Sequence, residues 1–320
     1  MNRRLLALAG GVGGARLAHG LLSVCAPDQL SIVVNTGDDF EHLGLSICPD
    51  LDTIFYTLSG LADRARGWGR AEESWHFMDT LRSLGGEDWF NLGDRDLALH
   101  VLRSVHLRAG GTLEQFTARL GERMGIDCVI APMSNDPVST RIHTDRGELA
   151  FQDYFVRLRC EPPVRAIDYA GAARAQPSDR LIAALADPTL GAVVLCPSNP
   201  WLSIAPIVAL PAVAAWFDAP QRRVPVVAVS PIVGGAALKG PAAKIMVELG
   251  FAASVLGLSD YYGARVDGWV IDELDRQHAA ALHDRGKSVM VSQTVMRTDE
   301  DRADLARTVI DFAERVQVRS

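Results

Sequence analysis

The sequence predicts an α/β fold built on a doubly wound, mainly parallel sheet with a helical insertion. Short apolar runs recur along the 320 residues, and segments with helical spacing separate them. The runs are almost continuously apolar, which is typical of strands covered by helices on both faces. Strands that alternate with helices favour right-handed crossovers and hence a parallel sheet. We expect one α/β unit over residues 1–320, with residues 51–125 as a helical insertion that caps the sheet.

Eight segments are predicted as strands because they are short, apolar and bounded by turn residues. They are residues 5–9, 31–34, 127–131, 192–196, 224–229, 254–256, 269–271 and 288–292. A hairpin is predicted over residues 140–151, with its turn at 145–147. Nine segments are predicted as helices because apolar residues recur every three or four positions. They are residues 15–24, 51–61, 74–84, 94–108, 113–124, 178–186, 242–249, 275–285 and 299–316.

Composition and charge exclude several classes of protein. Hydrophobic residues make up 48% of the chain and charged residues 22%, which fits a globular protein with a large core. The net charge of −7 argues against nucleic acid as a partner. Five scattered cysteines favour reduced thiols in a cytoplasmic protein without zinc. We expect no signal peptide and no membrane anchor, because the chain enters its first strand at once and lacks a long apolar segment.

The most informative segment is LALAGGVGGARLA, residues 5–17, in which an apolar strand ends in a glycine loop. The glycines are Gly10, Gly11, Gly13 and Gly14. Backbone N–H groups and the positive end of the following helix face the same space, so an anion, most often a phosphate, is expected there. The loop is no Walker motif, and Arg16 stands where the dinucleotide fingerprint has its third glycine. A tight turn without a ligand is the alternative interpretation.

Five loops after predicted strands are polar or rich in glycine, and a parallel sheet brings such loops to one edge. They are residues 10–14, 35–39, 132–136, 197–200 and 230–235. Short polar side chains in two of them are able to bind phosphate oxygens, sugar hydroxyls or base edges, although they also form ordinary turns. These side chains are Ser134, Asn135, Asp136, Ser198 and Asn199. Gly234 and Gly235, with Lys239 nearby, form either a second phosphate loop or a turn.

Acidic residues follow the second strand in two groups, Asp38 with Asp39 and Asp50 with Asp52. Carboxylates on loops suit Mg²⁺, which usually takes one or two of them together with phosphate oxygens and water. For Asp50 the favoured interpretation is an N-cap of the helix that starts at residue 51. His42 is the best placed of the histidines, because it lies beside the acidic loop.

The insertion holds a second group of candidates. Asp94 is a plausible N-cap of the helix 94–108, and Arg95 is either a phosphate ligand or part of a surface ion pair. Four aromatic residues could stack on a flat ring, although aromatic residues at helical spacing are more often core. They are Trp68, Trp75, Phe77 and Trp89.

Seven motifs in order carry a family resemblance. They are GGVGGARLAHGL, NTGDDFEHLGLSICPDLDTIFYTLSGL, LGDRDLALH, PMSNDPVST, FQDYFVR, CPSNP and VSPIVGGAALKGPAAK. Together they resemble the 2-phospho-L-lactate transferase family, whose bacterial members are also called phosphoenolpyruvate transferases. The motifs extend over nearly the whole chain, so the resemblance is specific although each motif alone is loose.

The resemblance implies a Rossmann-like core, usually in a homodimer, and a Mg²⁺-dependent transferase of coenzyme F420 biosynthesis. Family members take the guanosine diphosphate ester of a small acid, in which a phospholactyl, phosphoenolpyruvyl or phosphoglyceryl group is carried. They transfer that group to the terminal ribityl hydroxyl of 7,8-didemethyl-8-hydroxy-5-deazariboflavin and release GMP. The partners implied are therefore small-molecule substrates.

The resemblance also implies roles for particular residues. Asp52 is expected to be catalytic, by orienting the attacking hydroxyl or acting as a weak base, and to contact the deazaflavin together with Asn91. Asp39 and Asp52 are expected to hold the Mg²⁺ ion. The family commonly has Lys or Arg at the position of Asn91, so the identity of the transferred acid stays open.

The nucleotide is expected along the loops of the predicted sheet edge. The diphosphate would lie over Gly10–Gly14 and the Ser198–Asn199 loop. The guanosine would lie against either 134–136 or 230–235. The family has Ser-Asp-Asp where this chain has Ser134, Asn135 and Asp136, which removes one negative charge.

Two other functions compete with this one. A nucleotide-sugar-binding regulatory protein of the same superfamily would lack the deazaflavin region, so Asp52 and residues 92–96 argue against it. A nicotinamide-dependent oxidoreductase is disfavoured by Arg16 and by Asn35, which stands where an acidic residue is usual.

Overall fold

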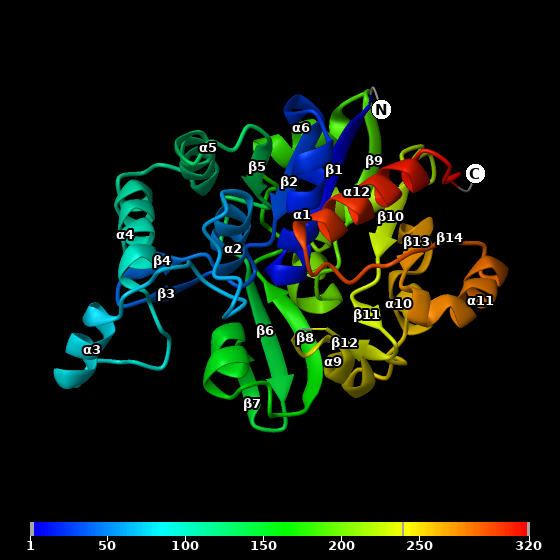
Figure 1. Cartoon of the computed structure of the whole chain (residues 1–320). Helices are drawn as coiled ribbons and strands as arrows, with labels where there is room; N and C mark the ends of the chain where they lie inside the picture. Colours follow the sequence, from blue (N-terminus) through cyan, green and yellow to red (C-terminus); the bar gives the residue numbers. More distant parts are fainter. Residues whose placement is uncertain (1–2, 239, 319–320) are drawn as a thin grey trace.

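The computed structural model describes residues 3–238 and 240–318, and its centre is a seven-stranded parallel sheet with helices on both faces (Figure 1). The strands lie in the order β14-β13-β10-β9-β1-β2-β5. Their bounds are β1 Arg4–Ala9, β2 Leu30–Val34, β5 Val129–Pro132, β9 Leu190–Leu195, β10 Val226–Val229, β13 Gly268–Ile271 and β14 Ser288–Val291. Each neighbouring pair is parallel, which confirms the predicted doubly wound α/β fold.

The helices cover the two faces of this sheet. Their bounds are α1 Gly11–Val24, α2 Pro49–Leu58, α3 His76–Ser83, α4 Asp94–Arg108, α5 Leu113–Arg123, α6 Asp179–Ala186, α7 Ala205–Val208, α8 Pro211–Phe217, α9 Ala242–Glu248, α10 Val255–Tyr262, α11 Ala279–Asp284 and α12 Asp299–Ala313. Leu5 and Ala7 of β1 belong to a core with α1, α2 and α12, whereas Leu6 and Leu8 belong to a core with α7 to α10. Successive side chains of a strand point to opposite faces, so both faces are apolar.

Two of the predicted elements are wrong. Residues 254–256 were expected to form a strand, but Ser254 is the N-cap of α10, and its hydroxyl accepts the N–H of Gly257 at 3.3 Å. Three residues are too few to distinguish the periodicity of a strand from that of a helix. The hydrogen bond that Ser254 accepts shows that a helix begins here. The single helix expected over 275–285 is a 3₁₀ helix, Glu273–His278, followed by α11.

Smaller sheets lie outside the central one. The predicted hairpin is confirmed as β6 Ser139–Thr144 and β7 Gly147–Ala150, and β8 Val164–Ala170 joins it as a third antiparallel strand. Two short hairpins were not predicted, β3 Phe40–His42 with β4 Leu45–Ile47, and β11 Ile232–Val233 with β12 Ala236–Ala237.

Residues 51–125 contain most of α2 and all of α3 to α5, and α3 and α4 extend away from the sheet beside the β3–β4 hairpin (Figure 1). The division of the chain into one unit with an inserted cap stays a prediction. All five cysteines are unpaired. Within the described residues no single helix is long and apolar enough to cross a membrane; Pro200–Val208 and Pro211–Phe217 reach that length only together, and they meet at 95°.

The order of the strands fixes where a ligand belongs. On one side of β1 the next strands in the sheet are β2 and β5. On its other side they are β9, β10, β13 and β14, so the later strands are added in the opposite direction. In such sheets the crevice beyond the carboxyl ends of the strands, at the point where the direction reverses, is the usual ligand site. The loops after β1 and β9 meet at this point.

Candidate active site

The glycine loop and the loop after β9 are locked together by one hydroxyl. Ser198 Oγ accepts the N–H of Gly10 at 3.1 Å and donates to the carbonyl of the same residue at 2.8 Å. A Cβ on Gly13 would lie 2.3 Å from the carbonyl oxygen of Pro197, and one on Gly14 would lie 2.4 Å from Ser198 Oγ. Glycine is therefore required at these two positions by the close approach of the second loop.

Asp50 ties the same loop to α2. Its carboxylate accepts the N–H of Gly11 at 2.7 Å and the side-chain amide of Asn35 at 2.9 Å. The prediction that Asp50 caps a helix is wrong, because α2 begins at Pro49 with Cys48 as its N-cap. Burial raises the pKa of Asp50 to about 6. Asp50 thus joins the loops after β1 and β2.

Asp50 belongs to a group of four carboxyl groups that we call the aspartate cluster: Asp38, Asp39, Asp50 and Asp52. Burial raises the pKa of each of them, and the charges of neighbouring members raise the pKa of Asp38 and Asp39 further. One carboxyl oxygen each of Asp38, Asp39 and Asp52 is buried without a hydrogen-bond partner in the part of the chain that the structure describes. Unpaired oxygens of this kind fit a hard divalent cation such as Mg²⁺.

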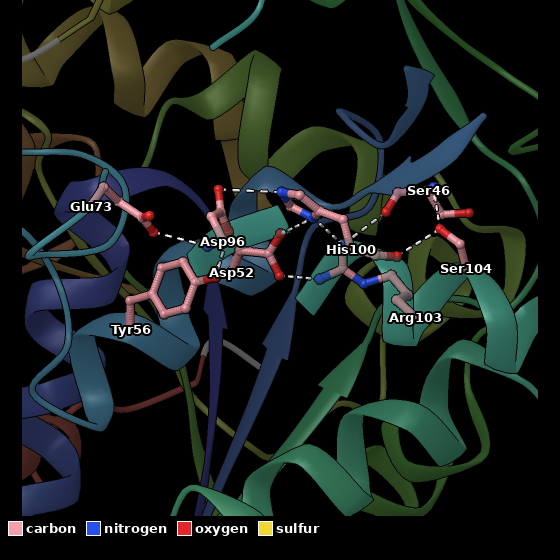
Figure 2. A network of polar contacts seen from close by, with 8 residues as sticks. All are labelled: Ser46, Asp52, Tyr56, Glu73, Asp96, His100, Arg103 and Ser104. Carbon is pink, nitrogen blue, oxygen red and sulfur yellow. Dashed lines mark hydrogen bonds and ion pairs between the residues drawn. The ribbon is translucent and has the colours of Figure 1, made fainter. Parts of the chain in front are cut away.

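Arg103 balances part of this negative charge. Its buried guanidinium pairs with Asp52 Oδ1 and donates to the carbonyl of Ser46 at 3.1 Å (Figure 2). Burial alone would lower the pKa of Arg103, but the Asp52 carboxylate raises it overall, so the guanidinium stays charged. Since Arg103 lies on α4 and Asp52 on α2, the ion pair joins these two helices.

His100 extends the contacts of Asp52 toward the start of α4. Its Nδ1 lies 3.6 Å from Asp52 Oδ2, and its Nε2 lies 3.2 Å from Asp96 Oδ2. The Tyr56 hydroxyl donates to Asp96, and Glu73 accepts the N–H of Asp96 at 2.9 Å (Figure 2). The ligand atoms of Asp52, Asp96 and His100 lie within 4.8 Å of one another, so they form a second set of groups able to hold a metal ion.

The segment before α4 differs from what was expected. Gly93 is the N-cap, and Asp94 instead accepts the Ser74 hydroxyl at 2.6 Å and the N–H of Phe77 at 3.0 Å, which caps α3. The N-cap prediction for Asp94 is therefore wrong. Arg95 forms the exposed ion pair that was its alternative, with Glu72 at 2.7 Å. Asn91 is exposed.

His42 lies in an aromatic cluster rather than on the acidic loop itself. Its ring is 5.3 Å from that of Trp89 and 5.8 Å from that of Phe90, and Arg157 lies 4.5 Å above the Trp89 ring. Burial lowers the pKa of His42, so the neutral imidazole is favoured. The other tryptophans of the insertion, Trp68 and Trp75, lie near the Arg66 guanidinium.

The remaining candidate loops lie on either side of this centre. β5 lies two strands from β1 on one side, and β10 lies two strands away on the other. In the loop after β5, Ser134 donates to the carbonyl of Gln176 at 2.6 Å, Asp136 accepts the N–H of Gln176 at 2.7 Å, and Asn135 caps α5 by accepting the N–H of Glu114 at 2.9 Å.

The loop after β10 turns tightly. Gly234 and Gly235 have φ of 59° and 79° and form the turn between β11 and β12, where the N–H of Gly234 donates to Asp275 at 3.0 Å. Residues with positive φ at both central positions are typical of such a hairpin. Asn199, in the loop after β9, caps the segment that follows by accepting the N–H groups of Trp201 and Leu202. Lys239 lies outside the described residues.

Sequence reasoning missed three residues of the Asp52 network: Tyr56, His100 and Arg103. A signal for two of them is present, since Asp96, His100 and Arg103 are spaced by four and three positions and share one face of α4. The first-turn carboxylate, the imidazole and the guanidinium therefore point the same way, toward α2.

Comparison with known proteins agrees with this architecture. The family model of 2-phospho-L-lactate transferase CofD matches residues 5–312. A phosphoenolpyruvate transferase from Kitasatospora aureofaciens is 40% identical, and the match covers 98% of this chain and 99% of that protein. A 2-phospho-L-lactate transferase from Methanosarcina mazei is 37% identical, with 96% of this chain and 99% of that protein covered.

A solved structure shares the fold at much lower identity. It is the crystal structure of a UPF0052-family protein from Bacillus halodurans, with a TM-score of 0.63 and 12% identity over 96% of this chain and 99% of that one. The family match and the two relatives each cover nearly the whole chain. The chain therefore belongs to the 2-phospho-L-lactate transferase family.

Proposed function

We propose that this protein transfers a phospho-acid group from its guanosine diphosphate ester to 7,8-didemethyl-8-hydroxy-5-deazariboflavin and releases GMP, as a step of coenzyme F420 biosynthesis. Family membership over residues 5–312 carries the proposal. Relatives named for phosphoenolpyruvate and for 2-phospho-L-lactate are similarly identical to this chain, so either acid is a candidate, and phosphoglycerate is a third.

The reaction is a displacement at phosphorus. The terminal ribityl hydroxyl oxygen forms a bond to the phosphorus that carries the acid and gives up its proton to solvent. The bridging P–O bond breaks, and GMP leaves with the electron pair of that bond. Such reactions depend on positioning and on neutralising charge rather than on a covalent intermediate. Asp52 is the residue proposed to hold the attacking hydroxyl, because its Oδ1 is fixed by Arg103 while its Oδ2 has no hydrogen-bond partner in the described structure. Asn91, exposed ahead of α4, is proposed to contact the deazaflavin with it.

The aspartate cluster supports the proposed use of Mg²⁺. Asp39 and Asp52 would hold the ion, since each has a buried carboxyl oxygen without a partner among the described residues. When bound, the ion would neutralise charge on the phosphate oxygens. Four buried carboxyl groups beside one arginine also need a counter-charge in their own right.

The glycine loop has two N–H groups left for a phosphate. The first four N–H groups of a helix lack partners within it, and in α1 these belong to residues 10–13. Gly10 and Gly11 already donate to Ser198 and Asp50. We propose that Val12 and Gly13 bind the diphosphate together with the Ser198–Asn199 loop, and that guanosine lies in one of the two flanking loops, at Ser134–Asp136 or at Gly234–Gly235.

A homodimer is proposed as the assembly. Val101, Leu102 and Val105 are 42%, 63% and 59% exposed, and all three lie on one face of α4. Large apolar side chains gathered on one helix face favour a protein partner. A second copy would cover this face on both subunits, as expected for a two-fold interface. A cytoplasmic location stays a prediction.

The test is direct measurement of the products. Purified protein is mixed with the deazaflavin and with the lactyl, enolpyruvyl or glyceryl guanosine diphosphate, and GMP and the coupled deazaflavin are measured by chromatography and mass spectrometry. We expect GMP release that requires both Mg²⁺ and the deazaflavin. Absence of GMP with all three donors, or binding of a UDP-sugar without binding of the deazaflavin, would contradict the proposal.

A further inference from the structure

A cavity beside the Asp52 network has no role in the function proposed above. It opens between the start of α1 and the C-terminal half of α2, and residues of the segments 60–69 and 297–302 also line it. Val12 of the glycine loop and Tyr56, which hydrogen-bonds Asp96, both line it. The cavity therefore lies between the N–H groups proposed to bind phosphate and the network of polar contacts around Asp52.

Four arginines line this cavity: Arg16, Arg64, Arg297 and Arg302. Asp299 pairs with two of them, Arg64 at 2.8 Å and Arg302 at 3.0 Å. Asp63, an acidic residue that lines the cavity, is already paired with Arg66 at 2.7 Å. Positive charge is therefore in excess around the cavity, in a protein whose net charge is −7.

Several donors of these arginines are not used within the described part of the chain. Arg302 is 8% exposed, and its Nε is buried without a hydrogen-bond partner. The Arg297 guanidinium forms no hydrogen bond or ion pair there, and Arg16 donates only to the carbonyl of Met296, at 3.1 Å. Burial lowers the pKa of Arg302, and the charges of Arg64 and Arg16 lower it further. A buried arginine that is repelled by two neighbouring arginines is stabilised by an anion beside it.

We propose that this cavity binds the carboxylate of the acid that the donor carries. The proposal rests on the function proposed above and names the part of the substrate that these arginines recognise. The guanidinium fork matches a carboxylate with two parallel hydrogen bonds. In the candidate acids, one or two carbon atoms separate the carboxyl group from the phosphate ester oxygen. A phosphate held by the N–H groups of Val12 and Gly13 therefore places the carboxylate within reach of the cavity that Val12 lines.

The first test measures binding without turnover. Phosphoenolpyruvate carries the carboxylate, and propyl phosphate of similar size lacks it. Calorimetry at constant ionic strength compares both probes on the wild type, Arg297→Gln and the control Arg165→Gln, an exposed arginine of β8. We expect phosphoenolpyruvate to bind about tenfold more tightly than propyl phosphate in the wild type and the control, as one charge-assisted pair provides. Arg297→Gln should remove most of this preference. Equal binding of the two probes to the wild type would overturn the proposal.

The second test uses the reaction. Arg297→Gln should raise the KM of the lactyl guanosine diphosphate about tenfold and leave that of the propyl guanosine diphosphate unchanged. An equal KM for the lactyl donor in Arg297→Gln and the wild type would overturn the assignment. If no donor supports GMP release, the proposed function fails, while the calorimetry still reports on the cavity. Because Arg297 is exposed and its guanidinium is unpaired among the described residues, thermal unfolding of the variant should match the wild type.

Discussion

The carboxylate of Asp50 accepts the backbone N–H of Gly11 at 2.7 Å, and this contact fixes the start of α2 against the glycine loop. Gly11 has φ of 63°, a backbone conformation that residues other than glycine rarely adopt. Because this N–H group of α1 already donates to Asp50, it is not available to a ligand. An acidic residue at the edge of a proposed phosphate site thus shapes the loop, and its charge must be matched when a phosphate binds.

Asp50 should make stability depend on pH. Its pKa of about 6 in the folded chain lies above the value of 3.8 expected when unfolded. The folded state therefore holds a proton that the unfolded state releases, and this residue's contribution to the free energy of unfolding falls by about 3 kcal/mol as pH rises from 3.8 to 6. Urea unfolding at several pH values should show a weaker fall for Asp50→Asn than for the wild type. The exposed control Asp28→Asn should follow the wild type; identical slopes for all three proteins would contradict the prediction.

Two glycines of the loop should respond differently to alanine. At Gly11 a Cβ meets nothing within 4 Å, so only the positive φ opposes it, at about 1–2 kcal/mol. At Gly13 the Cβ would lie 2.3 Å from a backbone carbonyl oxygen of the loop after β9. Gly13→Ala should therefore lower the free energy of unfolding more than Gly11→Ala and raise the KM of the donor. Equal melting temperatures would show that the loop after β9 moves freely.

Loss of Asp52 should affect stability as well as turnover. Asp52→Asn leaves the Arg103 guanidinium buried without its carboxylate, which typically costs about 3–5 kcal/mol. The double variant Asp52→Asn/Arg103→Met removes the stranded charge and should recover much of that stability. GMP release should stay low in both variants, because Asp52 is proposed to position the attacking hydroxyl. Normal turnover in the double variant would remove Asp52 from the mechanism.

Mg²⁺ should stabilise the free protein through the aspartate cluster. Ligands that bind only the folded state raise the melting temperature by mass action. The shift should be seen with magnesium chloride but not with sodium chloride of equal ionic strength, and Asp39→Asn should reduce it. Asp28→Asn is the matched control, since Asp28 is exposed and precedes β2 at the opposite edge of the sheet. A full shift in Asp39→Asn would place the ion elsewhere, with Asp52, Asp96 and His100 as the next set to test.

The exposed face of α4 should control assembly. Leu102→Glu introduces a charge at a side chain that is 63% exposed, so the isolated subunit should keep its fold. Sedimentation equilibrium should then report monomers for this variant and dimers for the wild type. Val247→Glu on α9 is the control, because Val247 is also 63% exposed but lies away from α4. A dimeric Leu102→Glu protein would exclude this face as the interface.

The parallel sheet could be predicted because its central strands are buried on both faces, so their sequences are almost unbroken apolar runs. β8 could not, since it is covered on one side only and carries Arg165 and Asp168 within its length. The strand predicted at 254–256 failed because Ser254 caps a helix, and a capping serine also occurs in turns and strand ends. Local sequence identifies elements best where burial is complete.

Some features of the candidate site could likewise be predicted from the sequence, and others could not. The loops at the carboxyl edge could be predicted from topology, because parallel strands bring them together. Their internal contacts could not: Asp50 reaches Gly11 and Ser198 reaches Gly10 only through tertiary packing. His100 and Arg103 look like ordinary polar positions of an exposed helix, and only the packing of α4 on β4 and α2 buries them.

The position of β1 between β2 and β9 has a consequence for folding during synthesis of the chain. β1 pairs with β2 on one side and with β9, which begins at Leu190, on the other. Until β9 has been synthesised, one edge of β1 has no partner strand, and an unpaired strand edge is prone to pair with the wrong segment. The same later segment brings the serine hydroxyl that holds Gly10. During synthesis the phosphate loop therefore takes its final shape only after more than half of the chain has emerged, and chaperones have most to protect before that point.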